Sequence, residues 1–336
     1  MSAPTPMKLT PARYSFKEAF APDLPDDQYV DGFAPSTCEF VPQGNPDWVW
    51  DRNILRDLIV WWQEGAPEPL YVFGHTGAGK SGALRQFCAS LRIPMYEKTI
   101  YEGLEFETLV VNVDLAGGNS ISSYAWLPLA MGAEGYPGIF VPNEIDRADP
   151  GMLVGLYEVL EGQPIAVHMG GLTHVRPSPV FRMAATGNTS LGGQGTDGID
   201  LYVSAQQQDI AFQDRCWKVK VSYLDADSEK ALLERLVPQL DVRIREPMVE
   251  IANDIRALFM GQSDSANAIS LTMSTRTLIR WARMTWSFRG AEARGVSPIR
   301  YALDRALLFA ADAEPPTREA ILRLVQGKFG DAMGGV

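Results

Sequence analysis

An eight-residue stretch between two apolar segments constrains this chain more than any other part of its sequence. It reads Gly74-His75-Thr76-Gly77-Ala78-Gly79-Lys80-Ser81 and fits the pattern G-x-x-x-x-G-K-[ST] at every position. The run Leu70–Phe73 before it has the continuous apolar character of a buried strand. After it, apolar residues recur at the spacing of one helix face, at Leu84, Phe87, Cys88 and Leu91. The stretch is therefore predicted to be a glycine-rich turn from a strand into a helix.

Such a turn has the properties of a phosphate-binding loop. Gly74, Gly77 and Gly79 allow the backbone to curl so that successive N–H groups point at an anion. The N-terminus of the following helix adds the positive end of its dipole. Lys80 is expected to place a cation on the β- and γ-phosphates, and Ser81 a hydroxyl on Mg²⁺. The alternative, a turn that binds nothing, is disfavoured because the motif and both flanks match, so the loop predicts binding of ATP with Mg²⁺.

Apolar runs that alternate with helical spacing predict a parallel sheet covered on both faces. Strands are expected at 70–73, 109–113, 138–141, 181–186 and 217–221. A β-hairpin is expected at 161–176, with Gly170-Gly171 at its turn. From about Asp225 onwards only helices are expected, around 232–237, 247–260, 274–288, 297–311 and 317–328. The expected fold class is α/β, with a parallel-sheet core, a β-hairpin insertion and a C-terminal helical domain.

Three segments follow from this pattern. Residues 51–222 are expected to form the nucleotide-binding α/β domain and residues 223–336 the helical domain. Residues 1–50 are rich in Pro, Asp and aromatic residues and show little periodicity. This N-terminal arm is interpreted either as a segment that wraps a neighbouring surface or as a partly disordered leader, and both interpretations remain open.

A second candidate element follows the strand expected at 138–141. A nucleotide hydrolase needs one carboxylate near Mg²⁺ and another that polarises the attacking water. Glu144 fits the second role, but the residue before it is Asn143, where Asp is expected. An amide still accepts a hydrogen bond from a metal-bound water but brings no negative charge, which weakens Mg²⁺ affinity without abolishing it. Asp146 is a candidate to compensate, and the alternative for the whole segment is an acidic helix start that favours the helix dipole.

Three further residues are candidates for contact with the nucleotide. Asn188 ends the strand expected at 181–186, where it either orients the lytic water or simply tolerates a turn. Arg215 precedes the next strand, where it either reaches a neighbour's γ-phosphate or forms a surface salt bridge with Asp214. Arg276 lies in the first turn of a helix, where a cation is unfavourable because it opposes the helix dipole. A bound phosphate would explain a cation at this position. The three histidines do not form a metal-binding set, and His168 and His174 are expected at the surface.

The ordered segments resemble the AAA+ ATPases. These segments are Gly74–Ser81, Asn143-Glu144, Gly187-Asn188, Asp214-Arg215 and Ser274-Thr275-Arg276. Within that family the chain looks like the MoxR-type branch, and more closely like the small ATPase subunits of cobaltochelatase. The most specific part comprises Pro179–Asn188, Tyr202, Gln206-Gln207 and Phe212–Arg215. The hairpin at 161–176 resembles that branch's insertion, Ser15–Phe20 resembles that subunit's start, and the resemblance covers residues 14–290.

The resemblance implies roles and an assembly. It makes Asn188 sensor 1, Arg215 the arginine finger and Arg276 sensor 2, with Glu144 as the base and the C-terminal helices as a lid. It also implies a homo-oligomeric ring, usually of six subunits, with ATP at each interface. Members of this branch often drive a partner that carries a von Willebrand factor A domain. Asn143 departs from the family's Asp, which puts full hydrolytic competence in question.

Three functions follow from these residues. The leading hypothesis is a ring-forming ATPase that couples hydrolysis to remodelling of a protein partner. The second is a nucleotide-gated scaffold with weak hydrolysis, motivated by Asn143, and the third is the ATPase subunit of a cobalt chelatase. A DNA-translocating motor is least favoured, because no basic groove is visible in the sequence.

Composition bears on partners and location. The formal net charge is −11, which disfavours non-specific binding to nucleic acid or to an anionic membrane. The three cysteines lie far apart, so neither a disulfide framework nor a zinc site is expected, and a reducing cytoplasm is favoured. No apolar run approaches the length of about 20 residues that a membrane span needs, and Met1–Glu18 lacks the apolar region of a secretory signal.

Overall fold

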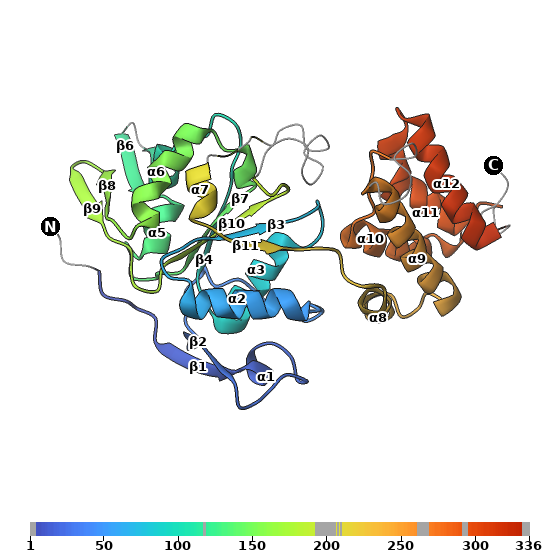
Figure 1. Ribbon diagram of the computed structural model, residues 1–336, viewed down its shortest axis with the longest axis horizontal. Coiled ribbons are helices and arrows are strands. Elements are labelled where there is room, and N and C mark those ends of the chain that lie inside the picture. Colours follow the sequence, from blue (N-terminus) through green and yellow to red (C-terminus); the bar gives the residue numbers. More distant parts are fainter. Residues whose placement is uncertain are drawn as a thin grey trace. The chain divides into compact units, whose positions relative to one another are not determined.

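The computed structural model describes residues 5–116, 119–191, 206, 208, 210–260, 269–290 and 295–330. The chain divides into two compact units, each described here by itself (Figure 1). The first comprises Met1–His75 and Gly79–Val221, and the second Thr76–Ala78 and Ser222–Val336. Within the described ranges, none of the helices has the length and apolar character that crossing a membrane requires.

A five-stranded parallel sheet forms the centre of the first unit (Figure 1). Its strands, in spatial order, are β11 (Trp217–Lys220), β3 (Leu70–Phe73), β10 (Arg182–Gly187), β7 (Ile139–Asn143) and β4 (Met95–Thr99). The inner strands β3, β7 and β10 are almost entirely buried, as expected where helices cover both faces. Because all strands run the same way, their carboxyl ends meet at one edge of the sheet.

Helices accompany this sheet in the first unit (Figure 1). They are α2 (Arg52–Glu64), α3 (Lys80–Leu91), α5 (Trp126–Met131), α6 (Pro150–Leu160) and α7 (Ile210–Asp214). Helix α2 begins at Asp51, whose carboxylate accepts hydrogen bonds from the amides of Asn53 and Ile54. Leu153 and Leu156 of α6 share a buried core with Phe140 of β7. Burial of these apolar faces is the main force that holds the unit together.

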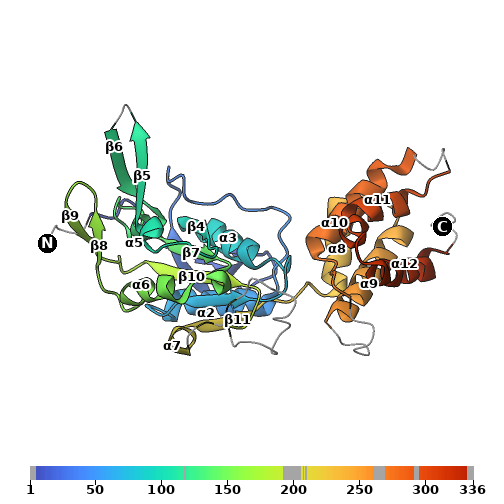
Figure 2. The ribbon, with the colours of Figure 1, turned by 90° about the horizontal axis from the view of Figure 1, so that it is seen from above.

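The strand expected at 109–113 is confirmed only in part, because a strand begins at Val111 but does not belong to the central sheet. Glu107–Val110 form the short helix α4, and Val111–Ala116 form β5, which pairs antiparallel with β6 (Asn119–Tyr124) outside the central sheet (Figure 2). The remaining strand of the sheet is instead β4, Met95–Thr99. The error has a physical cause: β4 is an edge strand whose polar second half breaks the apolar run, whereas the apolar side chains of Val113 and Leu115 are exposed on the hairpin.

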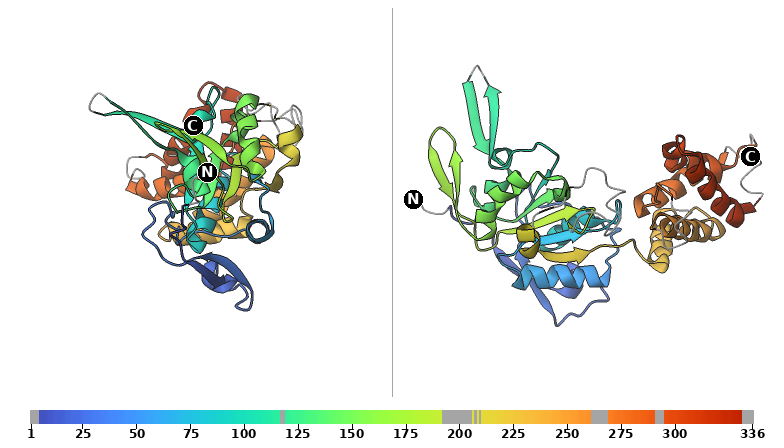
Figure 3. Two further views of the ribbon diagram at one scale, coloured as in Figure 1. Left: turned by 90° about the vertical axis from the view of Figure 1, so that its left-hand side faces the viewer. Right: turned by 45° about the horizontal axis from the view of Figure 1, so that its top comes forward.

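The other expected strands and the hairpin are confirmed. The strands expected at 138–141, 181–186 and 217–221 correspond to β7, β10 and β11. The hairpin consists of β8 (Ile165–His168) and β9 (Leu172–Val175), and Gly170 in its turn has φ 69°. The β5–β6 and β8–β9 hairpins extend from the same end of the unit (Figure 3). His168 and His174 lie exposed on β8 and β9, as predicted.

The N-terminal segment is folded onto its own unit. Strands β1 (Pro11–Ser15) and β2 (Tyr29–Phe33) pair antiparallel, with the single turn α1 (Phe16–Ala19) following β1. A Cβ added to Gly32 would lie 2.5 Å from the carbonyl oxygen of Leu91 in α3, so only glycine permits this close approach. The indole nitrogen of Trp62 in α2 donates to the Asp31 carbonyl at 2.8 Å. The surface that the described part of the arm contacts is therefore that of the same chain, and the interpretation as a disordered leader does not hold for residues 5–50.

The second unit is helical, as the sequence predicts. Its helices are α8 (Ala226–Leu236), α9 (Val242–Phe259), α10 (Thr275–Ser287), α11 (Pro298–Ala306) and α12 (Pro315–Phe329), with the short 3₁₀ helix η5 (Leu308–Ala311) between the last two. The first four begin at Asp225, Asp241, Ser274 and Ser297, each of which caps its helix by accepting a hydrogen bond from a backbone amide. Trp281 of α10 is fully buried at the centre of this core.

Candidate active site

The glycine-rich loop connects β3 to α3 in the way its sequence predicts. Gly74, Gly77 and Gly79 have φ of 150°, 75° and 95°, a region that other residues rarely adopt. Gly79 stands at the N-cap of α3, and no side chain caps this helix. The first amides of α3 are therefore left without the capping oxygen that most helices of the second unit have, as a site for a phosphate requires.

Lys80 folds back across the loop. Its ammonium donates to the carbonyl oxygens of Gly74 at 2.7 Å and His75 at 3.1 Å, and to Oδ1 of Asn188 at 2.9 Å. Burial lowers the pKa of Lys80 to about 8, while the charges of Asp146 and Glu144 act in the opposite direction. A polyanion placed in this loop would favour the charged form of the ammonium, so the side chain is suited to binding a triphosphate.

Ser81 contacts the end of a second strand. Its hydroxyl donates to Oδ1 of Asn143 at 2.7 Å, and the Thr186 hydroxyl donates to the same oxygen at 2.9 Å. Asn143 ends β7 and Thr186 lies near the end of β10, so parallel pairing of these strands brings three distant residues together. The amide nitrogen of Asn143 donates to Oε1 of Glu97 on β4 at 3.2 Å. Sequence analysis missed Glu97, because the strand that carries it was not recognised.

Glu144 occupies an unusual backbone conformation. Its φ is 59°, in the left-handed region, and it leads into a single 3₁₀ turn, Ile145–Arg147, rather than a longer helix. The Glu144 amide donates to the Thr186 hydroxyl at 3.2 Å, which fixes the turn to β10. Its carboxylate, more than a third exposed, pairs with Nε of Arg147 at 3.1 Å. An exposed carboxylate at this sheet edge can reach a water molecule, as the predicted base must.

Asp146 does not stand in for the missing acid at position 143. It is 1% exposed, and its Oδ2 accepts hydrogen bonds from the amides of Asn188 at 2.7 Å and Thr189 at 3.1 Å and from the Thr189 hydroxyl. This carboxylate therefore holds the end of β10, and with it Asn188, in place. The amide side chain of Asn188 contacts Lys80, which brings it to the phosphate loop as sequence analysis expects.

Arg215 lies at a different edge of the first unit. Its guanidinium pairs with Oε1 of Glu161 at 3.1 Å, donates to the Ala211 carbonyl, and packs 4.7 Å from the ring centre of Tyr157. Of the two alternatives for Arg215, a surface salt bridge is therefore present, with Glu161 as the partner and not Asp214. These contacts hold Arg215 beside α6 and α7, in a partly exposed position.

Arg276 belongs to the second unit. It is the second residue of α10, and the helix is capped by Ser274, whose hydroxyl accepts from the Thr277 amide at 3.1 Å. The hydroxyl of the neighbouring Thr275 donates to Glu229. Of the other residues singled out in the sequence, Tyr202 and Gln207 lie outside the described residues.

The donors beside the loop fit a hard cation that is shared with a nucleotide. Among the described residues there is no group of three or more His, Cys, Asp or Glu side chains that could hold a metal ion by themselves. The Ser81 hydroxyl and the Asn143 amide oxygen are neutral oxygen donors in mutual contact. Mg²⁺ keeps several waters and binds through few protein oxygens plus substrate phosphates, so this donor set fits it.

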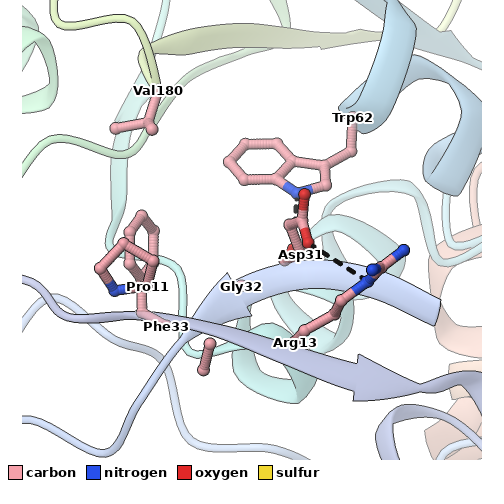
Figure 4. Close-up of a pocket in the computed structure, with 8 residues that line it drawn as sticks. Pro11, Arg13, Asp31, Gly32, Phe33, Trp62 and Val180 are labelled. Carbon is pink, nitrogen blue, oxygen red and sulfur yellow. Dashed lines mark hydrogen bonds and ion pairs between the residues drawn. The ribbon is translucent and has the colours of Figure 1, made fainter.

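A pocket of about 460 Å³ lies elsewhere in the same unit. It is formed by the β1–β2 hairpin together with Trp62 and Val180 (Figure 4). Its walls are mostly apolar, and the Arg13 and Asp31 side chains at its edge pair with each other at 3.8 Å. No residue of the phosphate loop lines it, so the candidate site does not depend on this pocket.

The chain is similar to several known proteins. Residues 229–327 match the family model described as CbbQ/NirQ/NorQ C-terminal. The chain is 28% identical over 256 residues to the aerobic cobaltochelatase subunit CobS of Sinorhizobium sp., an alignment that covers 72% of each protein. Among solved structures, the RuvB Holliday junction branch migration motor of Thermotoga maritima has a TM-score of 0.45 at 9% identity, covering 88% of this chain and 75% of that one. A katanin structure has a TM-score of 0.41 at 13% identity, covering 72% and 70%.

The parallel sheet, the phosphate loop and the polar residues at the ends of β7 and β10 define a P-loop ATPase of the AAA+ class, an enzyme that hydrolyses ATP. Within that class residues 229–327 match the CbbQ/NirQ/NorQ C-terminal family, which is of the MoxR type, and the sequence is similar to that of the cobaltochelatase subunit CobS.

Proposed function

We propose that this chain binds Mg-ATP at the interfaces of a homo-oligomeric, hexameric ring and couples hydrolysis to the remodelling of a protein partner. The observation that carries the proposal is the convergence of Lys80, Ser81, Asn143 and Asn188 at one end of the sheet. Four residues from three separate segments meet there, and each has the chemistry that its position in an ATPase requires.

Each side chain has a role that follows from its position. The loop amides and Lys80 would bind the β- and γ-phosphates, and Ser81 and Asn143 would hold Mg²⁺, which supplies charge neutralisation of the phosphates when it is bound. Glu144 accepts a proton from the attacking water, and Asn188 orients that water. Arg276 contributes a cation from the second unit, in the role of sensor 2.

Arg215 is proposed to act on the nucleotide of the neighbouring subunit. Its contacts with Glu161 and Tyr157 hold it on α6 and α7 in a partly exposed position, available to an adjoining surface. An arginine supplied in trans stabilises charge that develops on the γ-phosphate in the transition state. This role is what makes the ring necessary for turnover.

The nature of the partner follows from charge. A net charge of −11 favours a protein over nucleic acid as the partner. The resemblance to MoxR-type ATPases implies that this partner carries a von Willebrand factor A domain, and we propose a partner of that kind. The three thiols are unpaired, which supports action in the reducing cytoplasm. The relative CobS is a cobaltochelatase subunit by name, so a chelatase ATPase subunit is the alternative of the same class.

The replacement Glu144→Gln tests the catalytic assignment. We expect turnover of ATP to fall by a factor of about 100 or more, because a general base contributes roughly 10²–10⁴-fold. Nucleotide affinity is expected to stay within about twofold, because the loop and Lys80 are untouched. Turnover by release of phosphate and affinity by calorimetry are the two measurements, and Lys80→Ala, which should lose affinity, is the matched control. Retention of full turnover in Glu144→Gln would rule out this residue as the base.

A second candidate function is favoured by one residue, Asn143. If the chain is a nucleotide-gated scaffold, ATP assembles the ring but is scarcely hydrolysed, because the metal site lacks a carboxylate at this position. The two functions differ in the turnover of the wild-type ring together with its partner. Measurable turnover in the assembled ring supports the motor, and nucleotide-dependent assembly without turnover supports the scaffold.

A further inference from the structure

The side chain of Asn143 forms hydrogen bonds through both its oxygen and its nitrogen. Its oxygen accepts hydrogen bonds from the Ser81 and Thr186 hydroxyls at 2.7 and 2.9 Å. Its nitrogen donates to Oε1 of Glu97 at 3.2 Å. These three hydrogen bonds tie the amide to three different elements, α3, β10 and β4.

Glu97 determines which way this amide points. An ionised carboxylate can only accept hydrogen bonds, so the NH₂ group of Asn143 must face it. The amide oxygen then necessarily faces Ser81, the residue that carries the metal-binding hydroxyl of the loop. The Ser81 and Thr186 hydroxyls can donate or accept, so they could pair with either the oxygen or the nitrogen of the amide. Glu97 therefore determines the orientation of the amide.

We propose that Glu97 supplies the negative charge that position 143 lacks, acting on the Mg²⁺ site through the Asn143 amide. Glu97 is then a positioning residue, which orients and polarises the amide oxygen that faces Ser81. Carboxylates in this outer position hold and polarise metal-binding groups in many sites. This inference rests on the proposed function, because it concerns the metal that accompanies ATP.

The same geometry explains why asparagine suits position 143. An aspartate there would place a second carboxylate at hydrogen-bond distance from Glu97, and two such charges repel unless one takes up a proton. With asparagine at this position there is no such repulsion, and its amide nitrogen instead donates a hydrogen bond to Glu97. The pair Glu97 and Asn143 therefore carries one negative charge in total, as a single aspartate would.

A structural role for Glu97 is the competing explanation. Its second oxygen, Oε2, pairs with Nη2 of Arg85 on α3 at 2.7 Å, and the Arg85 side chain is half exposed. If Glu97 serves only to tie β4 to α3, loss of either partner has the same effect. If Glu97 serves the metal site, loss of Arg85 removes a competing cation and has the opposite effect or none.

The experiment measures how much Mg²⁺ strengthens binding of ADP, a nucleotide that avoids turnover. Affinity for ADP is determined by calorimetry in excess Mg²⁺ and in EDTA, for the full-length chain. The variants are Glu97→Gln, Arg85→Gln as the matched control, Asn143→Asp, and the double variant Glu97→Gln/Asn143→Asp, which exchanges the acid and the amide. Wild-type binding of ADP tests the proposed function separately from the inference.

We expect Glu97→Gln to lower the Mg²⁺ enhancement by about 10-fold or more, the usual effect of losing an outer partner at a metal site, with ADP affinity in EDTA unchanged. Arg85→Gln should keep or increase the enhancement, and the double variant should restore it. The inference is overturned if Glu97→Gln leaves the enhancement unchanged, or if Arg85→Gln lowers it equally. Should Glu97→Gln fold poorly, the double variant and Arg85→Gln decide. If the Mg²⁺ enhancement of the double variant does not exceed that of Asn143→Asp, the exchange of roles between the two positions is contradicted.

Discussion

Thr186 shows how much of the site depends on one small side chain. Its hydroxyl accepts from the Glu144 amide and donates to Oδ1 of Asn143, so it joins the end of β10 to the last residue of β7 and to the residue that follows it. Glu144 holds a φ of 59°, which a residue with a Cβ keeps only when its surroundings compensate. The hydrogen bond from Thr186 is part of that compensation. Local strain at Glu144 is thus linked directly to the position of the metal-facing amide.

The three cysteines allow a prediction about pH. Burial raises the pKa of Cys38 and Cys88, and raises the pKa of Cys216 to about 12. The folded protein therefore holds protonated thiols at a pH where the unfolded chain begins to lose these protons. We expect alkylation by iodoacetamide at about pH 8 to be at least about tenfold slower in the folded protein than in denaturant. Mass spectrometry of the labelled protein measures this.

The same shifts have a consequence for stability. The pKa values of the thiols are higher in the folded protein than in the unfolded chain. Their contribution to the free energy of unfolding is therefore fully present below about pH 9 and is lost as the pH rises further. The free energy of unfolding should therefore fall with rising pH above about 9. A variant with all three cysteines replaced by alanine should show a smaller slope, and an unchanged slope would contradict the assignment to the thiols.

At the scale of elements, one buried ion pair joins three helices of the second unit. The Arg256 guanidinium of α9 donates to both carboxylate oxygens of Glu229 in α8 at 2.8 Å, and both side chains are almost completely buried. Nε of Arg256 donates to the Met273 carbonyl just before α10, and the Thr275 hydroxyl donates to Glu229. Every charged group is therefore hydrogen-bonded, which is the condition under which a buried pair is tolerated.

Glu229→Gln is expected to destabilise the second unit by about 3–5 kcal/mol, because it leaves the buried charge of Arg256 without its counter-ion. Urea unfolding followed by tryptophan fluorescence measures this, with buried Trp281 as a reporter of this unit. The matched control is Glu250→Gln, which breaks the exposed pair between Glu250 and Lys328 and should have little measurable effect. Equal changes in the free energy of unfolding for the two replacements would show that burial does not increase the contribution of the Glu229–Arg256 pair to stability.

At the scale of the whole molecule, the proposed ring makes Arg215 and Glu144 parts of different active sites. In a head-to-tail ring each interface joins two unlike surfaces, so one subunit supplies the base and its neighbour the arginine. A subunit that lacks Arg215 retains a complete phosphate loop and base of its own. Its nucleotide can then be served by any neighbour whose arginine is intact.

Mixing two inactive variants tests this arrangement. Arg215→Ala and Glu144→Gln are each expected to show little turnover alone, whereas a one-to-one mixture should recover up to about a quarter of wild-type turnover, the fraction of interfaces that combine an intact base with an intact arginine. Phosphate release from the separate and mixed proteins is the measurement. No recovery in rings shown by particle imaging to contain both variants would exclude action of Arg215 in trans.

Much of this architecture was predictable because it is encoded by neighbours in the sequence. The phosphate loop, the strands that end in Asn143 and Gly187, and the β8–β9 hairpin follow from apolar runs and glycines only a few residues apart. The helices of the second unit follow from apolar spacing and from capping residues such as Ser274. Strand β4 was missed because Glu97 and Lys98 interrupt its apolar run, and an edge strand needs no continuous one.

The sequence by itself determined the loop between β3 and α3, most of the strands around it, and the separate helical unit, because side chains at regular spacing specify local structure. Only the tertiary structure decided which distant side chains meet. The contact of Glu97 with Asn143 joins positions 46 residues apart, and that of Arg215 with Glu161 spans 54. Such contacts depend on strand order and register, which arise when the whole sheet packs, and no local pattern contains them.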